Sequence, residues 1–230
     1  MGEIEGESNQ SKLHLVHINP EPIGIITLPT KKHLEYKNKI WSIWNNSSSE
    51  QRQKHNDLKE HLCNTNDQNL FNSFPQLSEL KHDMMKFIIA YIQQIGYECE
   101  EVIINSAWLN NSQKGSVLDF HFHSNSFISA NYFIDFSAEK HSQLTFQNDR
   151  VITNKSPAFQ ALVIPRSKKP TIYNTECIGL NAKEGQIAIW RSHQIHGYST
   201  PNNSGNRLTL SLNSIPRKMD NGKYSFYISE

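Results

Sequence analysis

The feature that most constrains the fold is a series of short strand-like segments running from Glu101 to the C-terminus. Each is rich in Val, Ile, Phe, Tyr, Trp or Thr and is bounded by Gly, Pro, Asn or Ser. In order they read EVIINSAWLN, SVLDFHFHSN, FISANYFIDF, SQLTFQN, FQALVIP, GQIAIWRS, NRLTLSLNSI and KYSFYIS. About eight strands with turn signals at this spacing are typical of a β-sandwich or a β-barrel.

The residues before Glu101 follow a different pattern. Segments 13–18 and 23–28 are strand-like and are separated by prolines. A helix with a loose 3.6-residue periodicity is expected next, with Thr30 as its N-cap. Residues 45–69 are almost wholly polar, which predicts an exposed loop with at most a short helix at 57–62.

A second helix is predicted at 74–95, where apolar residues form a broad stripe. Ser73 and Gln76 have the spacing of a capping box, and Gly96 suits the position that follows a helix. The regular stripe predicts a supporting helix packed on a sheet, and no chemistry is assigned to it.

Helices first and many strands afterwards predict an α+β fold, a β-sandwich backed by N-terminal helices. At 230 residues the chain is long enough for one domain with a substantial core. We therefore expect a single domain over 1–230. Within it, 1–100 supply N-terminal strands and supporting helices, and 101–230 supply the β-sandwich core.

The charge balance and the cysteines narrow the class of function. Lys and Arg number 23 and Asp and Glu number 22, so a nucleic-acid partner is not expected. The sequence contains no run of 18 apolar residues, so a membrane span is not expected. The acidic N-terminus argues against a signal peptide. Three widely spaced cysteines predict reduced thiols in a cytoplasmic protein.

The first motif with chemical potential is DFHFH at 119–123. In a strand, side chains alternate between the two faces, so Asp119, His121 and His123 are expected to share one face. Two imidazoles on one face can bind a single transition-metal ion. Taken alone, a polar outer face of an edge strand explains this motif better.

The second motif combines histidines with a later arginine. His193 and His196 follow a strand-like segment, and Arg207 opens the next one. Arg207, Thr209 and Ser211 alternate and should share a face, where a guanidinium and two hydroxyls could hold a carboxylate. Together, the two motifs favour a metal site beside a carboxylate pocket.

The two motifs resemble the iron(II)- and 2-oxoglutarate-dependent oxygenases. The order is H-x-H, a histidine some seventy residues later, and an arginine eleven residues after that. Residues 105–215 are similar to a bacterial and phage group within that superfamily. The matching positions are Trp108, Asn110, Gly115, His121, His123, Ser129, Tyr132, Ser192, His196, Pro201, Asn202, Arg207, Thr209, Ser211 and Asn213.

The resemblance implies a double-stranded β-helix, a cupin-like jelly roll, with Fe(II) and 2-oxoglutarate as cofactors. It implies His121, His123 and His196 as metal ligands and Arg207 as the anchor of the C5 carboxylate of 2-oxoglutarate. Four further residues are implied as contacts to 2-oxoglutarate: Asn110, Tyr132, Thr209 and Ser211. The expected activity is an O2-dependent oxidation, of hydroxylase type, of a small molecule or a peptide side chain.

One departure from the superfamily concerns the metal ligands. Most members use H-x-Asp/Glu with a distal histidine, whereas here the second position is His123. The simplest site therefore has three neutral imidazoles. Asp119 is expected to accept a hydrogen bond from His121 rather than bind metal. The spacing to Arg207 favours His196 over His193 as the distal ligand.

Three other classes of protein are compatible with the same residues. The first is a three-histidine, cupin-type dioxygenase that uses no 2-oxoglutarate. In such an enzyme Arg207 would have no co-substrate carboxylate to bind. The second is a non-enzymatic metal- or ligand-binding jelly-roll protein, or a phage structural or host-interaction protein. It would be favoured if the protein bound neither iron nor 2-oxoglutarate. A halogenase is the weakest alternative, because such enzymes usually carry a small residue where this chain has His123.

Overall fold

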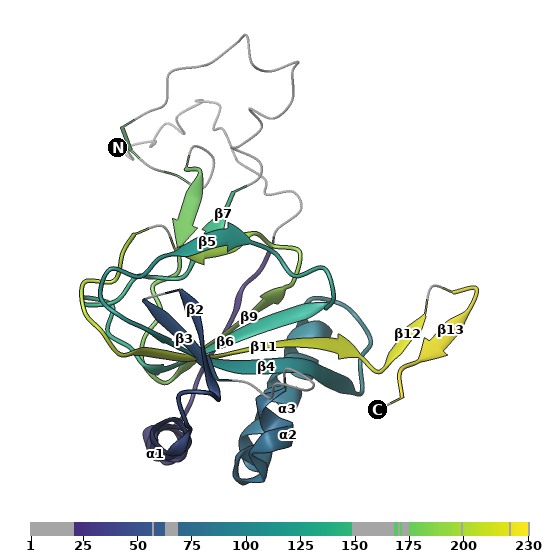
Figure 1. Ribbon diagram of the computed structural model, residues 1–230. Helices are drawn as coiled ribbons and strands as arrows, with labels where there is room; N and C mark the ends of the chain where they lie inside the picture. The colour runs from purple at the N-terminus through teal and green to yellow at the C-terminus, as the bar shows by residue number, and fades with distance from the viewer. Residues whose placement is uncertain are drawn as a thin grey trace, which may run out of the picture.

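The computed structural model describes residues 21–56, 58–62, 69–148, 168–169, 171, 175–198, 200–220 and 222–229. Within these residues a large and a small antiparallel sheet face each other, and helices cover the outer side of the large one (Figure 1). The α+β, helix-backed β-sandwich is confirmed. The predicted segments 13–18 and 159–165, together with Cys63, lie outside the described residues.

The large sheet contains seven strands in the order β1-β9-β6-β11-β4-β3-β2. In that order the strands are Gly24–Thr27, Gln186–Arg191, Ile128–Asp135, Arg207–Pro216, Val102–Ser112, Lys59–Leu62 and Arg52–Asn56. The two longest strands, β4 and β11, pair along their whole length at the centre of the sheet. Strands distant in the sequence are therefore neighbours, which brings the two predicted motifs to one region.

The small sheet lies over the inner face of the large one and has the order β5-β10-β7-β8. Its strands are Leu118–His121, His196–Tyr198, Thr145–Gln147 and Cys177–Gly179. A separate two-stranded hairpin, β12 (Lys218–Asp220) and β13 (Ser225–Tyr227), projects near the C-terminus (Figure 1).

Both predicted helices are present, but their starts differ from the prediction. Helix α1 spans Thr30–Asn46, and its N-cap is Pro29 rather than Thr30. The second helix is split into α2 (Leu70–Ser73), the 3-10 turn η1 (Pro75–Leu77) and α3 (Ser78–Gln94).

The proposed capping box is wrong because Ser73 closes α2 instead of opening α3. Proline at position 75 has no amide hydrogen and begins a 3-10 turn, so the long helix starts only at Ser78. Asn69 caps α2, its side chain accepting a hydrogen bond from the amide of Phe71 at 3.2 Å. Gly96 has φ of 93°, a left-handed conformation that favours glycine, as expected at the end of a helix.

The polar segment 45–69 contains a β-hairpin, so the expectation of a loop with a short helix at 57–62 is wrong. Strand β3 pairs with the edge of β4, with Lys59 opposite Ser112 and Leu62 opposite Leu109. Backbone pairing with an available edge outweighs the low β-propensity of the polar residues.

Among the described residues, no helix combines the length and the apolar composition that a membrane crossing requires.

The alternation of side chains in the central strands separates the core from a polar cavity. Leu208 and Leu210 of β11 are fully buried in the main hydrophobic cluster, which also contains Ile40 of α1 and Met84 of α3. A second cluster, including Phe146 and Trp190, lies at the small sheet. The residues between the leucines of β11 therefore face the opposite side, toward the small sheet.

Candidate metal and carboxylate site

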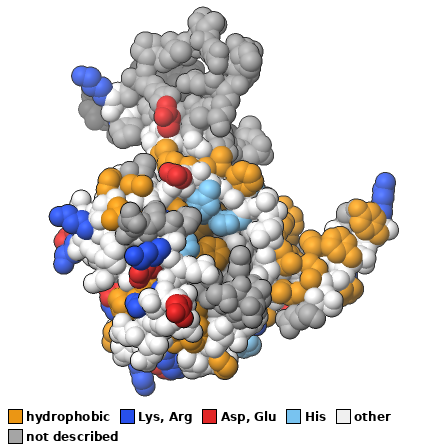
Figure 2. All heavy atoms as spheres, in the orientation of Figure 1, with side chains coloured by type: hydrophobic (Ala, Val, Ile, Leu, Met, Phe, Trp, Pro, Cys, Tyr) orange, Lys and Arg blue, Asp and Glu red, His pale blue; other side chains and the backbone are white. Residues whose placement is uncertain are grey.

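The floor of the cavity is the inner face of the large sheet. Arg207, Thr209 and Ser211 all line it, as their alternation along β11 predicts. Strand β4 adds Asn110 beside Thr209 and Trp108 beside Ser211. The cavity has a volume of about 360 Å³, and histidine side chains gather at its surface (Figure 2).

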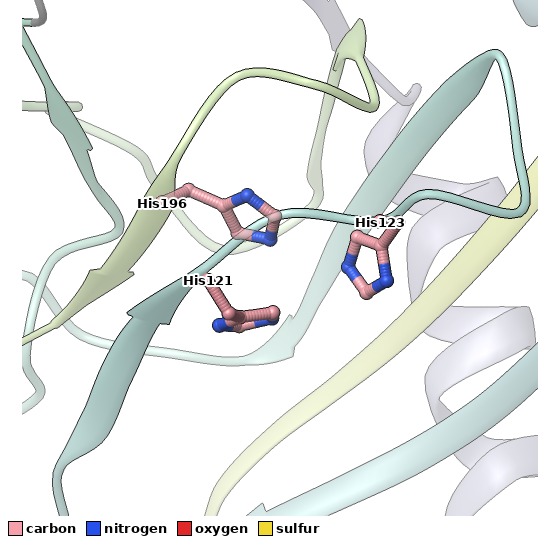
Figure 3. Close-up of side chains that lie close together, drawn as sticks. All are labelled: His121, His123 and His196. Carbon is pink, nitrogen blue, oxygen red and sulfur yellow. The ribbon is translucent and has the colours of Figure 1, made fainter.

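Three histidines converge at one end of this cavity. His121 ends β5 and His196 begins β10, and the two are direct partners in the strand register. His123 comes from the segment after β5 and points toward both (Figure 3). One ring nitrogen from each residue lies within 4.8 Å of the others. This spacing allows the three side chains to meet at a single ion.

The convergence of His121 and His123 does not arise from a shared strand face. Strand β5 ends at His121, and the amide of His123 donates to the carbonyl of Ser192, at 3.0 Å, after the end of β9. The chain thus leaves the small sheet before His123 and bridges toward the large one. The two rings still lie only 5.1 Å apart between centroids, so the prediction of proximity is correct and its geometric reason is wrong.

Main-chain carbonyls fix the tautomers of two of these rings. Nδ1 of His121 lies 2.8 Å from the carbonyl oxygen of Asp119, and Nδ1 of His196 lies 2.9 Å from that of Gln194. A carbonyl only accepts, so each Nδ1 carries the hydrogen and each Nε2 keeps a free lone pair. Both rings therefore offer Nε2 as a metal ligand.

His123 is held by side chains of the large sheet. The amide group of Asn213 lies 3.3 Å from His123 Nδ1. The hydroxyl of Ser129 donates to Oδ1 of Asn213 at 2.8 Å and lies 2.9 Å from the hydroxyl of Ser192. This buried network limits rotation of the His123 ring and leaves its other nitrogen for a ligand.

Burial keeps two of the imidazoles neutral. Desolvation lowers the pKa of His196 to about 3, with a further contribution from the neighbouring histidines. Desolvation and then His121 lower the pKa of His123 to about 4. Both rings are thus unprotonated at neutral pH, which metal coordination requires.

Asp119 and His193 lie outside this cluster. The carboxylate of Asp119 is at the exposed rim, and it is the main-chain carbonyl of Asp119 that bonds to His121. The expected role of Asp119 as acceptor is therefore performed by its backbone and not by its side chain. His193 is 61% exposed and lies 3.7 Å from Glu21, which agrees with the choice of His196.

The other end of the cavity is cationic. Arg207 is 3% exposed, its Nε donates to the carbonyl of Ser142 at 3.1 Å, and its guanidinium lies 4.6 Å from the ring centre of Tyr198. Burial lowers the pKa of Arg207. Among the described residues, no carboxylate forms an ion pair with it.

The residues expected to contact 2-oxoglutarate divide between the two faces of the sheet. The Asn110 amide donates to Ser211 Oγ at 2.9 Å, and Ser211 Oγ donates to Asn131 Oδ1 at 3.0 Å, so these groups form a polar floor. Tyr132 lies on the opposite face, where its hydroxyl is 2.7 Å from Nδ1 of His33 in α1. The expectation for Tyr132 is therefore wrong, since its side chain belongs to the packing between sheet and helix.

Lys59 lines the cavity beside Arg207 and was not anticipated from the sequence. Lys59 belongs to the β2–β3 hairpin. The polar composition of this segment predicts a loop and not a hairpin. The segment KEHL carries no strand-like apolar pattern, and only pairing with β4 directs Lys59 and His61 inward. No local sequence signal identifies them.

The donor set suits a divalent transition metal. Three neutral imidazoles bind iron, zinc, copper or nickel and leave coordination positions open for other ligands. The buried guanidinium in the same cavity is suited to a carboxylate. Thus one cavity provides a candidate metal end and a candidate carboxylate end.

Comparison with known proteins agrees with this chemistry. Residues 106–213, which include all three histidines and Arg207, match the family described as "Putative 2OG-Fe(II) oxygenase". No curated protein matches the chain.

Several solved structures share the fold at low sequence identity. An oxidoreductase of the 2OG-Fe(II) oxygenase family from Burkholderia pseudomallei has a TM-score of 0.53 and 10% identity, covering 83% of this chain and 84% of that one. SnoN, a non-heme alpha ketoglutarate dependent epimerase from nogalamycin biosynthesis, has a TM-score of 0.58 and 10% identity, covering 86% and 80%. HygX from Streptomyces hygroscopicus, with nickel and 2-oxoglutarate bound, has a TM-score of 0.54 and 10% identity, covering 85% and 83%.

These likenesses show that the two facing sheets form the jelly-roll, double-stranded β-helix that the sequence predicts. Iron(II) and 2-oxoglutarate are the cofactors named by the matching family. The part of the chain that holds the candidate site, residues 106–213, is therefore similar to a 2OG-Fe(II) oxygenase family, and the fold is the one seen in solved structures that carry that description.

Proposed function

We propose that this protein is a 2-oxoglutarate-dependent oxygenase in which His121, His123 and His196 hold Fe(II) and Arg207 holds the C5 carboxylate of 2-oxoglutarate. The observation that carries the proposal is the pairing, in one cavity, of three converging imidazoles with a buried guanidinium that forms no ion pair with any described carboxylate. If the protein bound a metal but no carboxylate ligand, the burial of Arg207 in this cavity would have no explanation.

In this proposal the chain's own residues position the cofactors. Nε2 of His121 and of His196 face the metal because their Nδ1–H groups are bound to backbone carbonyls. Arg207 supplies the carboxylate contact, with Thr209, Ser211 and Asn110 as further polar contacts on the floor. When bound, iron(II) and 2-oxoglutarate supply an O2-dependent oxidation of substrate, coupled to conversion of 2-oxoglutarate to succinate and carbon dioxide.

The proposed reaction is hydroxylation of a small molecule or of a peptide side chain. The cavity walls support this choice because they combine the apolar Trp108, Val117 and Leu144 with few charged groups near the histidines. An uncharged C–H-bearing group fits there better than a polyanion. SnoN, which has a similar fold, is described as an alpha ketoglutarate dependent epimerase, so hydroxylation is not the one reaction to test.

A three-histidine dioxygenase that uses no 2-oxoglutarate is the second candidate. It is favoured because, among the described residues, no carboxylate joins the histidine cluster. Aerobic incubation with Fe(II) and 2-oxoglutarate distinguishes the two. We expect succinate to form slowly even without the natural substrate, and to stop when a chelator removes the metal. Iron binding without any succinate would favour the second candidate.

A further inference from the structure

Lys59 of β3 is a buried cation whose electrostatic neighbours in the described part of the chain are Tyr198, Arg207 and Asp119, none of which forms a salt bridge with it. Lys59 is 2% exposed and lines the cavity, and within the described part of the chain its Nζ atom meets no acceptor at hydrogen-bonding geometry, although Tyr198 lies close to it. None of the ion pairs among the described residues includes it. Since burying an unpaired ammonium is costly, the site is suited to an anion that comes from outside the chain.

The strand register places Lys59 beside Arg207. Ser112 of β4 is the partner of Lys59 on one side and of Arg207 on the other, so the three residues form one row across the sheet. The hairpin that carries Lys59 lies along the edge of β4 (Figure 1). Two long cationic side chains therefore start from the same level of the cavity floor.

Tyr198 of β10 lies close to both cations. Lys59 Nζ is 5.6 Å from the centre of its ring, and the Arg207 guanidinium is 4.6 Å from it. The hydroxyl of Tyr198 lies 3.0 Å from Ser112 Oγ and 3.4 Å from Ser116 Oγ. The ring of Tyr198 thus contacts both cations at one end of the cavity, and its hydroxyl is held by the two serines.

Resting on the proposed function, we propose that Lys59 and Arg207 bind the distal carboxylate of 2-oxoglutarate together, as a two-cation clamp. Arg207 supplies planar donors and Lys59 supplies a second positive charge from the N-terminal hairpin. The clamp makes the cavity selective for 2-oxo acids with a distal carboxylate, and it gives the β2–β3 hairpin a role in cosubstrate binding.

The test compares two cosubstrates bound to the anaerobic Fe(II) protein. 2-Oxoglutarate carries the distal carboxylate, and 2-oxopentanoate has the same carbon chain without it. Binding of each is measured by calorimetry for wild type, Lys59→Met and Lys59→Gln. Lys54→Met is the matched control, because Lys54 is an exposed lysine on β2 of the same hairpin.

We expect Lys59→Met to weaken 2-oxoglutarate roughly 10- to 100-fold, as loss of a charge-assisted contact implies. Binding of 2-oxopentanoate and of iron should be unchanged, and Lys54→Met should behave as wild type. Without cosubstrate, the melting temperature of Lys59→Met should equal or exceed that of wild type, because a buried unpaired charge is removed. A lysine with a purely structural role would instead lower it.

Unchanged 2-oxoglutarate affinity in both Lys59 variants would overturn the clamp while leaving the proposed function intact. An equal loss for both 2-oxo acids would also overturn it, since Lys59 would then act through the metal end or the fold. If wild-type protein binds iron but not 2-oxoglutarate, the proposed function itself fails, and the clamp fails with it.

Discussion

At the scale of single residues, the site is oriented largely by the backbone. His121 and His196 each bond through Nδ1 to the carbonyl two residues earlier, so no partner side chain is needed to select their tautomer. His123 differs because the side chain of Asn213 contacts its Nδ1, and Asn213 is in turn held by Ser129. Side-chain substitutions outside the triad should therefore affect His123 more than the other two imidazoles.

His123 occupies the position that carries a carboxylate in most of the superfamily. We expect His123→Asp to keep iron binding, because a carboxylate is also an oxygen donor suited to Fe(II), whereas His123→Ala should lose at least tenfold in affinity. Iron content and affinity are measured by anaerobic titration. Normal iron binding by His123→Ala would remove this residue from the ligand set.

At the scale of elements, the close pairing of β5 with β10 sets the distance between His121 and His196. Gly197 follows His196, and a Cβ there would lie 2.7 Å from the carbonyl oxygen of Leu118 and 2.9 Å from that of Asp119. Both are backbone atoms, so the strands would have to separate. The Asp119 carbonyl is also the acceptor for His121.

Gly197→Ala should therefore weaken iron binding about tenfold or more, because it displaces one histidine and the carbonyl that orients another. Gly179→Ala is the control, since Gly179 lies in β8 of the same sheet and nothing lies within 4 Å of the added Cβ. The iron affinity of both variants, measured by titration, tests this prediction. Equal affinities would show that strand spacing does not set the metal site.

The sequence predicts an element when the pattern that specifies it lies within the element itself, and misses an element that depends on pairing with a distant segment. Strands β6, β9 and β11 are predicted because their apolar residues are local and dense. The β2–β3 hairpin is missed because its pairing with β4 connects residues some fifty positions apart. Lys59 is missed for the same reason, whereas His121, His196 and Arg207 are found because their motifs carry their own spacing.

At the scale of the whole molecule, folding removes imidazoles from water, which links stability to pH. The pKa of His123 is lowered to about 4 and that of His196 to about 3, mainly by burial. Both have ordinary values near 6.5 in the unfolded chain. At pH values between the folded-state and unfolded-state pKa of these histidines, the unfolded state binds more protons than the folded state. The free energy of unfolding of the metal-free protein must therefore fall as the pH decreases.

We expect the metal-free protein to be less stable in urea at pH 5 than at pH 7. The double variant His123→Gln/His196→Gln should show a smaller pH dependence, with a remainder from His141, whose pKa burial also lowers. Carboxylates with lowered pKa, such as Glu184, act mainly at lower pH. Identical wild-type stability at the two pH values would contradict this account.

The whole molecule brings the three histidines and Arg207 into one cavity between its two sheets, and Arg207 is the residue that, in our proposal, distinguishes a 2-oxoglutarate site from a simple metal site. The most direct measurement is titration of 2-oxoglutarate into anaerobic Fe(II) protein, wild type and Arg207→Ala, followed by the metal-to-ligand charge-transfer band. Loss of a buried charge-assisted contact costs about 2–5 kcal/mol, or roughly 30- to several-thousand-fold in affinity.

We expect Arg207→Ala to lose 2-oxoglutarate affinity by that factor and to keep the iron affinity of wild type, because Arg207 is not a proposed ligand. Arg207→Lys should recover only part of the loss, since an ammonium lacks the planar fork. Equal 2-oxoglutarate affinity in Arg207→Ala and wild type would contradict the carboxylate site and favour a three-histidine enzyme that uses no 2-oxoglutarate.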